Sequence, residues 1–435
     1  MWIEVIHLTP LDLRLIRTDS IQKGILLPKP PPVSGVGLVD ALESSFARAL
    51  RLFYPLAGRL ASEERGDGTV TVSLRCTGEG AEFVHAAAPG VAAADIVSSI
   101  YTPSVVRDEL HSFDPALGAD AAVEALPLVS VQVTELADGV FVGMTLNHSV
   151  ADGAAFWHFV NTWAEIHRRG VGASGDNPRE LSTPAPVLQR WSVEAWPVPI
   201  PLPFGKLGDI ARPVERATVR ECFLTFSTAS VSELTARANG EVAVTAAAAA
   251  AISPLQAVLA HLWRASCRAR RMPPEQGTSY SVLIDCRGRV EGMPPGYVGN
   301  AVAFGKAKGL GWTARLLNNA EASFDEASVR ESAGRWVRRP ELMFISDLSS
   351  AGTALATGSS TWLDVFGNDF GWGRPMTMRS GAGNKTDGKA AVRGAGAGRE
   401  RVAGAVLGFG RAREAPRRRG VHGRGELAGV RLPMQ

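Results

Sequence analysis

The sequence is poor in cysteine, with four in 435 residues and no CxxC pair. This spacing disfavours both a disulfide framework and a zinc site, so we expect reduced thiols and no metal. The first residues, MWIEVIHLTP, lack the basic and apolar regions of a signal peptide, and we expect a cytoplasmic protein. The most apolar window, residues 245–263, is interrupted by Pro254, Gln256 and His261, which argues against a membrane span.

Positive charge is in excess only in one terminal segment. The whole chain has a formal net charge of +3. Residues 388–435 contain ten Arg, one Lys and three Glu, a local net of +8, so the other 387 residues sum to −5. A basic protein is a candidate for nucleic-acid binding, but here the body of the chain is mildly acidic. We therefore expect no nucleic-acid partner.

The length and composition favour a globular protein of two domains. The chain is 45% hydrophobic and 20% charged, and it is too long for one small core. Residues 172–213 are rich in Pro, Gly and Ser and include WPVPIPLPF at 196–204, which is typical of an extended linker. We predict an N-terminal domain over residues 1–171, a crossover linker over 172–213 and a C-terminal domain over 214–389. Both domains are expected to mix helices and strands.

A predicted hairpin places a candidate catalytic histidine at the end of a strand. Residues 128–135 alternate apolar and polar side chains, an Asp-Gly turn follows, and residues 140–147 alternate again. The second strand therefore ends beside His148, and Asp152 could cap the helix that follows. Two interpretations are open at this point. Either His148 faces a cleft and does chemistry, or it packs under the turn and Asp152 is only a helix cap.

Two features of the second half concern phosphate binding. Ser253-Pro254 predicts a helix start, with the serine as cap, and the free N–H groups of a first helical turn suit a phosphate. Residues 383–389 read GNKTDGK, close to a nucleotide-binding loop, but Ala390 stands where that loop needs a hydroxyl for magnesium. No apolar strand precedes this segment and no periodic helix follows it, which excludes a nucleoside-triphosphate site.

Six motifs occur in an order that resembles the plant BAHD acyltransferases, a family of enzymes that depend on CoA thioesters. The two signatures are HxxxD, here HSVAD at 148–152, and DFGWG at 369–373. The supporting motifs are HLTPLDL (7–13), FYPLAGRL (53–60), DCRGR (285–289) and GYVGNA (296–301). The resemblance spans roughly residues 5–389. It implies an α/β (α+β) fold of two chloramphenicol-acetyltransferase-like halves, with donor and acceptor entering a central channel from opposite faces.

The resemblance also implies roles for the motif residues. His148 would be the general base, because a neutral imidazole can take the proton of an alcohol or amine at cytosolic pH. The acceptor then attacks the acyl-CoA thioester directly, without a protein nucleophile and without an acyl-enzyme. Asp152 would turn away from this base and pair with Arg287 to support the channel, and Trp372 would anchor the DFGWG loop. Acyl-CoA is expected as co-substrate, with no bound cofactor, and the enzyme is expected to be a monomer.

Weaker candidates complete the predicted site. Asp369 is a candidate second catalytic acid, although a structural role in the DFGWG loop is favoured. The predicted donor site comprises Ser253, Asp285 and Arg289. Ser359 and Ser360 are candidates for the acceptor pocket.

The pattern stops after residue 389. No period of 2 or 3.6 continues through residues 390–435, and we predict a disordered Arg/Gly-rich tail. A nucleic-acid-binding tail is the alternative, but it has a single aromatic residue, Phe409. Two readings of the whole chain follow. It is either an active acyltransferase or a truncated or frame-altered, non-catalytic relative.

Overall fold

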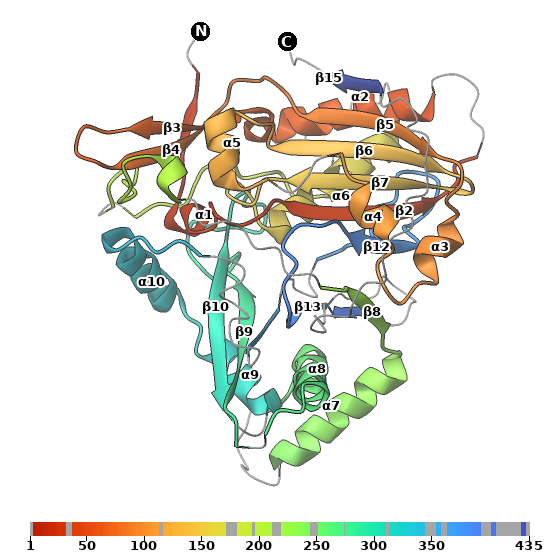
Figure 1. Cartoon of the computed structure of the whole chain (residues 1–435), viewed down its shortest axis with the longest axis vertical. Helices are drawn as coiled ribbons and strands as arrows, with labels where there is room; N and C mark the ends of the chain where they lie inside the picture. Colours follow the sequence, from red (N-terminus) through yellow and green to blue (C-terminus); the bar gives the residue numbers. More distant parts are fainter. Residues whose placement is uncertain are drawn as a thin grey trace, which may run out of the picture.

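The chain is seen here in a computed structural model that describes residues 3–31, 37–112, 116–170, 181–193, 196–210, 219–243, 251–273, 275–309, 313–343, 354–357, 363–392, 402–405 and 428–431. These residues form two lobes (Figure 1). The upper lobe in this view contains most of the first 170 residues, and the lower lobe contains most of the helices and strands that follow the linker.

A six-stranded sheet is the centre of the first lobe, in the order β12-β2-β7-β6-β5-β15. Its strands are β2 (Ile21–Pro28), β5 (Glu82–Ala88), β6 (Val129–Leu136), β7 (Gly139–Leu146), β12 (Thr377–Ser380) and β15 (Ala428–Arg431). The antiparallel pair β6–β7 is the predicted hairpin; β6 lies one residue later and β7 one residue earlier than predicted. The hairpin prediction is therefore confirmed, and the chain leaves the sheet at the end of β7, two residues before His148.

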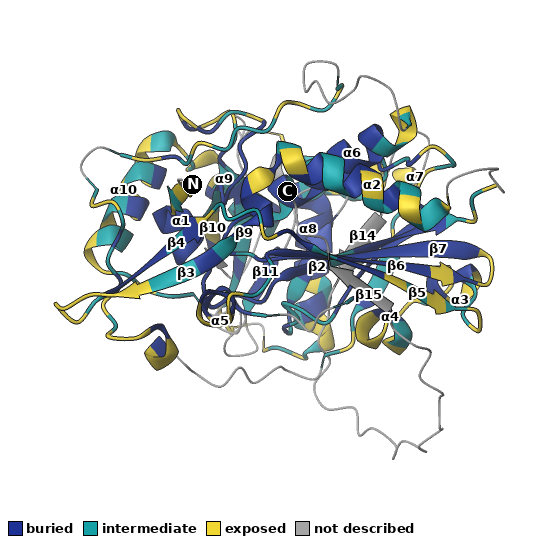
Figure 2. Ribbon diagram, turned by 90° about the horizontal axis from the view of Figure 1, so that it is seen from above, coloured by how far each residue is buried: buried dark blue, intermediate teal, exposed yellow. Residues whose placement is uncertain are grey.

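Helices cover both faces of this sheet because its side chains alternate between two apolar clusters. Ile25 and Val142 pack toward α2 (Leu38–Leu52) and α6 (Gly153–Arg169), which lie together on one face (Figure 2). Leu26 and Phe141 pack instead against α3 (Ala93–Val97) and α4 (Ser104–Asp108). The sheet is consequently covered on both sides, and α6 shares one apolar cluster with α2 and the sheet.

A second six-stranded sheet, in the order β10-β9-β11-β13-β14-β8, forms the other lobe. Its strands are β8 (Cys222–Thr225), β9 (Thr278–Asp285), β10 (Val302–Gly309), β11 (Ala354–Thr357), β13 (Lys389–Val392) and β14 (Val402–Ala405). The helices of this lobe are α7 (Thr228–Ala243), α8 (Pro254–Ala269), α9 (Thr313–Ala322) and α10 (Glu326–Arg338). Helix α8 starts as predicted, because the Ser253 hydroxyl accepts a hydrogen bond from the Gln256 N–H at 3.2 Å and proline is the first helical residue.

A small sheet and several short helices complete the first lobe. The sheet has the order β1-β4-β3, with β1 (Val5–His7), β3 (Arg59–Glu64) and β4 (Val70–Arg75). The short helices are α1 (Pro10–Leu13), η1 (Tyr54–Ala57), α5 (Gly118–Glu124) and η3 (Leu207–Ile210). The last of these lies in the linker, whose described parts, residues 181–193 and 196–210, otherwise form no helix or named strand.

The structure differs from the sequence prediction in two places. Strand β12 lies within the range predicted as the C-terminal domain, yet it pairs with β2 of the first sheet. Strands β14 and β15 lie within the segment predicted to be a disordered tail, yet β14 joins β13 to β8 and β15 pairs with β5. These eight residues are paired as strands although the segment lacks a side-chain pattern, because backbone pairing does not require one; the disordered tail as a whole stays a prediction. The domain boundaries themselves stay a prediction.

Candidate active site

His148 lies where the two lobes meet, in the turn between β7 and α6. Its carbonyl oxygen accepts a hydrogen bond at 2.8 Å from Nδ2 of Asn300, a residue of the second lobe. The residue is half-buried, and its Nδ1 is buried without a hydrogen-bond partner among the described residues. Burial lowers the pKa of His148 below its ordinary value, and the nearby Asp152 charge only partly opposes this effect. The imidazole is thus neutral at pH 7, the form that can accept a proton.

The Asp152 carboxylate is fully occupied by other donors and leaves no acceptor site for His148. Oδ1 accepts hydrogen bonds from the Ala154 and Ala155 N–H groups at 3.0 Å, which caps α6, and from Nη2 of Arg287 at 2.9 Å. Oδ2 accepts from Nη1 of Arg287 at 2.9 Å and from the Ala301 N–H at 2.8 Å. A carboxylate offers about four lone-pair sites. These five donors therefore exclude a His–Asp dyad in this arrangement.

Arg287 reaches Asp152 from the loop between β9 and β10, so the predicted contact between these two residues is present. Both side chains are almost completely buried, at 6% and 2% exposure. The guanidinium also donates to Asp285 at 3.1 Å and to two backbone carbonyls, those of Tyr297 and Gly299. The two carboxylates outweigh burial and raise the pKa of Arg287, while its charge holds the pKa of Asp152 low against the effect of burial. The ion pair thus connects the two lobes at the start of α6, four residues after His148.

Three further polar residues at this junction were not identified as site residues from the sequence. Asp12 is buried, and its Oδ1 accepts from the backbone N–H and Nδ2 of Asn300 at 3.0 and 2.9 Å. Arg190 of the linker donates to the carbonyls of Val298 and Val150, and Nη1 lies 3.7 Å from the Asp12 carboxylate. Asp12 and Asn300 lie in two of the supporting motifs, HLTPLDL and GYVGNA, which was the available signal. Nothing in the linker sequence marked Arg190.

The DFGWG loop is anchored at the other end of α6 from His148. The carboxylate of Asp369 accepts hydrogen bonds from the Gly371 and Gly373 N–H groups at 2.8 and 3.2 Å, and its carbonyl accepts from Arg168. Trp372 stacks edge-on to His167 at 5.4 Å and donates to the Pro28 carbonyl. The 17 residues of α6 span about 25 Å. Asp369 therefore closes its own loop and is not brought to His148, contrary to its candidacy as a catalytic acid.

Two of the three predicted donor-site residues line a cavity of about 270 Å³ in the second lobe. Asp285 and Arg289 belong to its wall, beside Arg287 and Gln256. Ser253 is not in the lining, because its hydroxyl is used to cap α8, but it holds Gln256, whose amide donates to Glu321 at 2.8 Å. Because Arg287 is part of its lining, the cavity adjoins the Asp152–Arg287 ion pair that supports His148.

Ser359 and Ser360, the candidates for the acceptor pocket, lie outside the described residues. Within the described ranges no cluster of three or more His, Cys, Asp or Glu is arranged to hold a metal ion. None of the helices in those ranges has the length and hydropathy needed to cross a membrane.

Sequence comparisons match this chain to known acyltransferases. A model of the Transferase family matches residues 2–403. An uncharacterised acetyltransferase of Arabidopsis thaliana is 34% identical over 404 residues, which cover 89% of this chain and 87% of the relative. The BAHD acyltransferase DCR of the same plant is 30% identical, with 88% and 81% covered. Shikimate O-hydroxycinnamoyltransferase of Nicotiana tabacum is 28% identical, with 78% of each chain covered.

Solved structures of low sequence identity share the fold. TRI101 of F. sporotrichioides, in complex with coenzyme A and T-2, aligns with a TM-score of 0.69 at 16% identity and covers 93% of this chain and 95% of its own. Vinorine synthase aligns with a TM-score of 0.63 at 19% identity, with 93% and 90% covered. The predicted two-lobed fold is confirmed by these likenesses.

Proposed function

Because the chain belongs to the BAHD acyltransferase family, we propose that it transfers an acyl group from acyl-CoA to a hydroxyl or amine of a small plant metabolite, with His148 as general base. The observation that carries this assignment is the state of the imidazole. It is neutral, its Nδ1 has no hydrogen-bond partner among the described residues, and it stands in a turn held from both lobes. A base that must take a proton from an alcohol needs these properties.

The reaction requires no covalent intermediate on the protein. The acceptor oxygen or nitrogen loses its proton to His148 and attacks the thioester carbonyl. The tetrahedral intermediate then expels the CoA thiolate, to which His148 returns the proton. Acyl-CoA enters as a co-substrate, in keeping with the coenzyme A present in the TRI101 complex that shares this fold.

Asp152 and Arg287 support the geometry in this proposal and take no part in proton transfer. Asp152 caps α6 and binds Arg287 and the Ala301 N–H, and Asn300 beside it holds the His148 carbonyl. The base is therefore positioned by contacts between the lobes. Trp372 anchors the DFGWG loop on α6 and β2, and we assign it the same kind of supporting role.

The donor site is proposed at the cavity lined by Asp285 and Arg289. Arg289 is partly exposed, and Glu321 at 3.9 Å is its ion-pair partner, so the guanidinium can exchange this weak surface pair for a phosphate of CoA. Ser253 contributes by fixing the first turn of α8 beside the cavity. A cytoplasmic location and a monomeric state are further parts of this proposal.

The alternative reading, a truncated or frame-altered relative without activity, predicts that the second sheet is left open after β13. Strand β14 instead bridges β13 and β8 with antiparallel pairing on both sides. This observation favours the active enzyme.

The test is turnover with acyl-CoA thioesters against a panel of phenolics, alcohols and amines, read by mass spectrometry. His148→Ala is expected to lower kcat by about 10²–10⁴-fold while CoA binding stays near the wild-type value. His158→Ala is the matched control, because His158 lies on α6 and its imidazole bonds the Pro184 carbonyl. Retention of more than about a tenth of the wild-type rate in His148→Ala would rule out the general base.

A further inference from the structure

The turn that carries His148 is held at two backbone carbonyls by residues from outside the first lobe. Nδ2 of Asn300 donates to the His148 carbonyl at 2.8 Å. Nη2 of Arg190, in the linker, donates to the Val150 carbonyl, also at 2.8 Å. These two contacts are additional to the ion pair of Asp152. The backbone of the turn is therefore held on both sides of residue 149.

One carboxylate, that of Asp12, contacts both of these donors. Its Oδ1 accepts from the backbone N–H and from Nδ2 of Asn300 at 3.0 and 2.9 Å, and Nη1 of Arg190 lies 3.7 Å from the same oxygen. Its Oδ2 accepts from the N–H and the hydroxyl of Thr9 at 3.0 and 2.9 Å, within the cap of α1. We name Asp12, Asn300 and Arg190 the Asp12 cluster. It connects α1, the linker and the second lobe to the two carbonyls of the turn.

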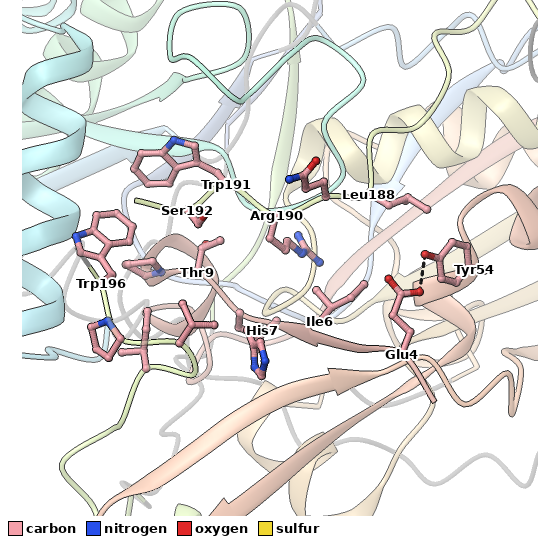
Figure 3. A pocket seen from close by; sticks show the side chains of 16 residues that line it. Glu4, Ile6, His7, Thr9, Tyr54, Leu188, Arg190, Trp191, Ser192 and Trp196 are labelled. Carbon is pink, nitrogen blue, oxygen red and sulfur yellow. Dashed lines mark hydrogen bonds between the residues drawn. The ribbon is translucent and has the colours of Figure 1, made fainter. Parts of the chain in front are cut away.

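The Asp12 cluster is shielded from solvent. Asp12 and Asn300 are completely buried, and the Arg190 side chain is 7% exposed. Thr9 and Arg190 line a cavity of about 500 Å³ between β1 and the linker (Figure 3), but Asp12 is not part of this lining. Burial alone would lower the pKa of Arg190, but the Asp12 carboxylate raises it above its ordinary value. Buried charges are screened little by solvent, so the charge of Asp12 acts strongly on its neighbours.

The Asp12 carboxylate also determines which way the Asn300 amide points. The two hydrogens of Nδ2 go to the Asp12 carboxylate and to the His148 carbonyl. A flipped amide would place its oxygen against these two acceptors and lose both hydrogen bonds. Asp12→Asn would permit the flip, because an amide at this position can donate to the oxygen of Asn300. The contact with the His148 carbonyl therefore depends on a carboxylate at position 12.

We propose that Asp12 is a positioning residue for the base, which it holds through Asn300 at the His148 carbonyl and through Arg190 at the Val150 carbonyl. This inference rests on the proposed function, in which His148 takes the proton of the acceptor. Asp12 acts on the base indirectly, so its loss should affect the rate of turnover more than the binding of substrates. The linker, through Arg190, is then part of the support of the active site.

The test compares Asp12→Asn with Glu165→Gln in the full chain. Glu165 is the matched control, because it is also a buried carboxylate of the first lobe and accepts hydrogen bonds from the linker, from the Ser182 and Thr183 N–H groups. With acyl-CoA and an acceptor, Asp12→Asn should lower kcat about 10–100-fold and change the KM of either substrate less than about threefold. Glu165→Gln should lower Tm and leave kcat at the wild-type value.

A second measurement follows the base without any substrate. The chain has eight histidines, and NMR of protein labelled at the histidine Cε1 atoms resolves them; the signal that disappears in His148→Gln is that of His148. Asp12→Asn should shift or broaden this signal, and Glu165→Gln should leave it unchanged. Asn300→Ala and Arg190→Met each remove one of the two contacts and should shift it as well. In the Asp12→Asn background each of them should lower kcat by less than it does alone.

An unchanged His148 signal in Asp12→Asn, or a lower Tm with wild-type kcat, overturns the proposal and limits Asp12 to a role in folding. If Asp12→Asn does not fold, Asn300→Ala and Arg190→Met decide, because each keeps Asp12 in place; an unchanged His148 signal in both overturns the proposal. Absence of turnover by the wild type with every acceptor would refute the proposed function instead. The NMR comparison would then decide the role of Asp12 by itself.

Discussion

Replacing Asp152 with Asn tests whether this carboxylate joins the lobes or assists His148. The change removes the charge opposite a guanidinium that is 6% exposed, while an amide oxygen can still cap α6. Breaking one side of a buried ion pair costs about 3–5 kcal/mol, because the other charge is left buried without its partner. Asp285 lies 3.1 Å from Arg287 and still supplies a counter-charge. We therefore expect the lower end of this range, about 3 kcal/mol.

For a cooperative unit of about 200 residues, 3 kcal/mol corresponds to a fall in Tm of about 6–12 °C. This fall in Tm is measured by calorimetric melts of the wild type, Asp152→Asn, Arg287→Met and the double variant. The single variants both remove the same pair, so the double variant should be about 2–3 kcal/mol more stable than the sum of the single losses predicts. Additive melting shifts would refute the pairing as the source of stability.

The pH dependence separates the ion pair from a simple loss of packing. Burial alone would raise the pKa of Asp152, but Arg287 and the N–H donors hold it below the ordinary value. A depressed folded-state pKa means that the stabilisation is present above the unfolded value of about 3.9 and is lost as the pH falls through the folded pKa. Between pH 5 and pH 3 the wild type should therefore lose more Tm than Asp152→Asn. Parallel curves would contradict this linkage.

Three other predictions follow from the same contacts. Burial would raise the pKa of Glu165, but the Ser182 and Thr183 N–H groups lower it to about 2. Glu165→Gln should therefore lower the free energy of unfolding by about 1–3 kcal/mol at pH 7. In denaturant titrations this difference between wild type and variant should shrink as the pH falls from 4.5 toward 2. Because burial lowers the pKa of His148, the midpoint of the acidic limb of the kcat/KM profile should lie below pH 6.5. A midpoint above pH 6.5 would indicate another base. Of the described strands, deleting residues 406–435 removes β15 alone, whereas deleting 393–435 also removes β14 and exposes the edges of β13 and β8. The second deletion should therefore lower Tm further and raise aggregation. Identical melts would support the prediction of a disordered tail.

Local signals predicted the elements that position the site. The alternating segments around the Asp-Gly turn became β6 and β7, and this hairpin placed residue 148 at a strand end. Asp152 and Ser253 were recognised as helix caps from their positions before apolar periodic segments, and both accept the expected backbone hydrogen bonds. Such features depend on neighbours within a few residues, which a single sequence contains in full.

Local signals could not predict which distant segments of the chain pair with one another. Strand β12 has four residues and pairs with β2 more than 350 positions earlier. Strand β14 reads VAGA, which carries almost no side-chain pattern, and its place is set by the backbone of β13 and β8. Arg190 lies in a segment without regular structure and finds its acceptors in both lobes. In each case the determining partner lies far away in the sequence.

The spacing of His148 and Asp152 shows why geometry must decide chemistry here. Four positions apart, an imidazole and a carboxylate are compatible with a dyad or with a base and a helix cap. Five donors from α6, Arg287 and Ala301 saturate the carboxylate, so it cannot also orient the ring. The imidazole is instead kept neutral by burial, and its loop is held by Asn300 from the opposite lobe. A base tuned by burial between two lobes depends on their closure, so loosening the Asp152–Arg287 contact should raise the His148 pKa toward its ordinary value as well as lower stability. A shift of the acidic limb of kcat/KM in Arg287→Met measures this coupling, and an unchanged limb in a destabilised variant would show that the ion pair acts on the fold alone.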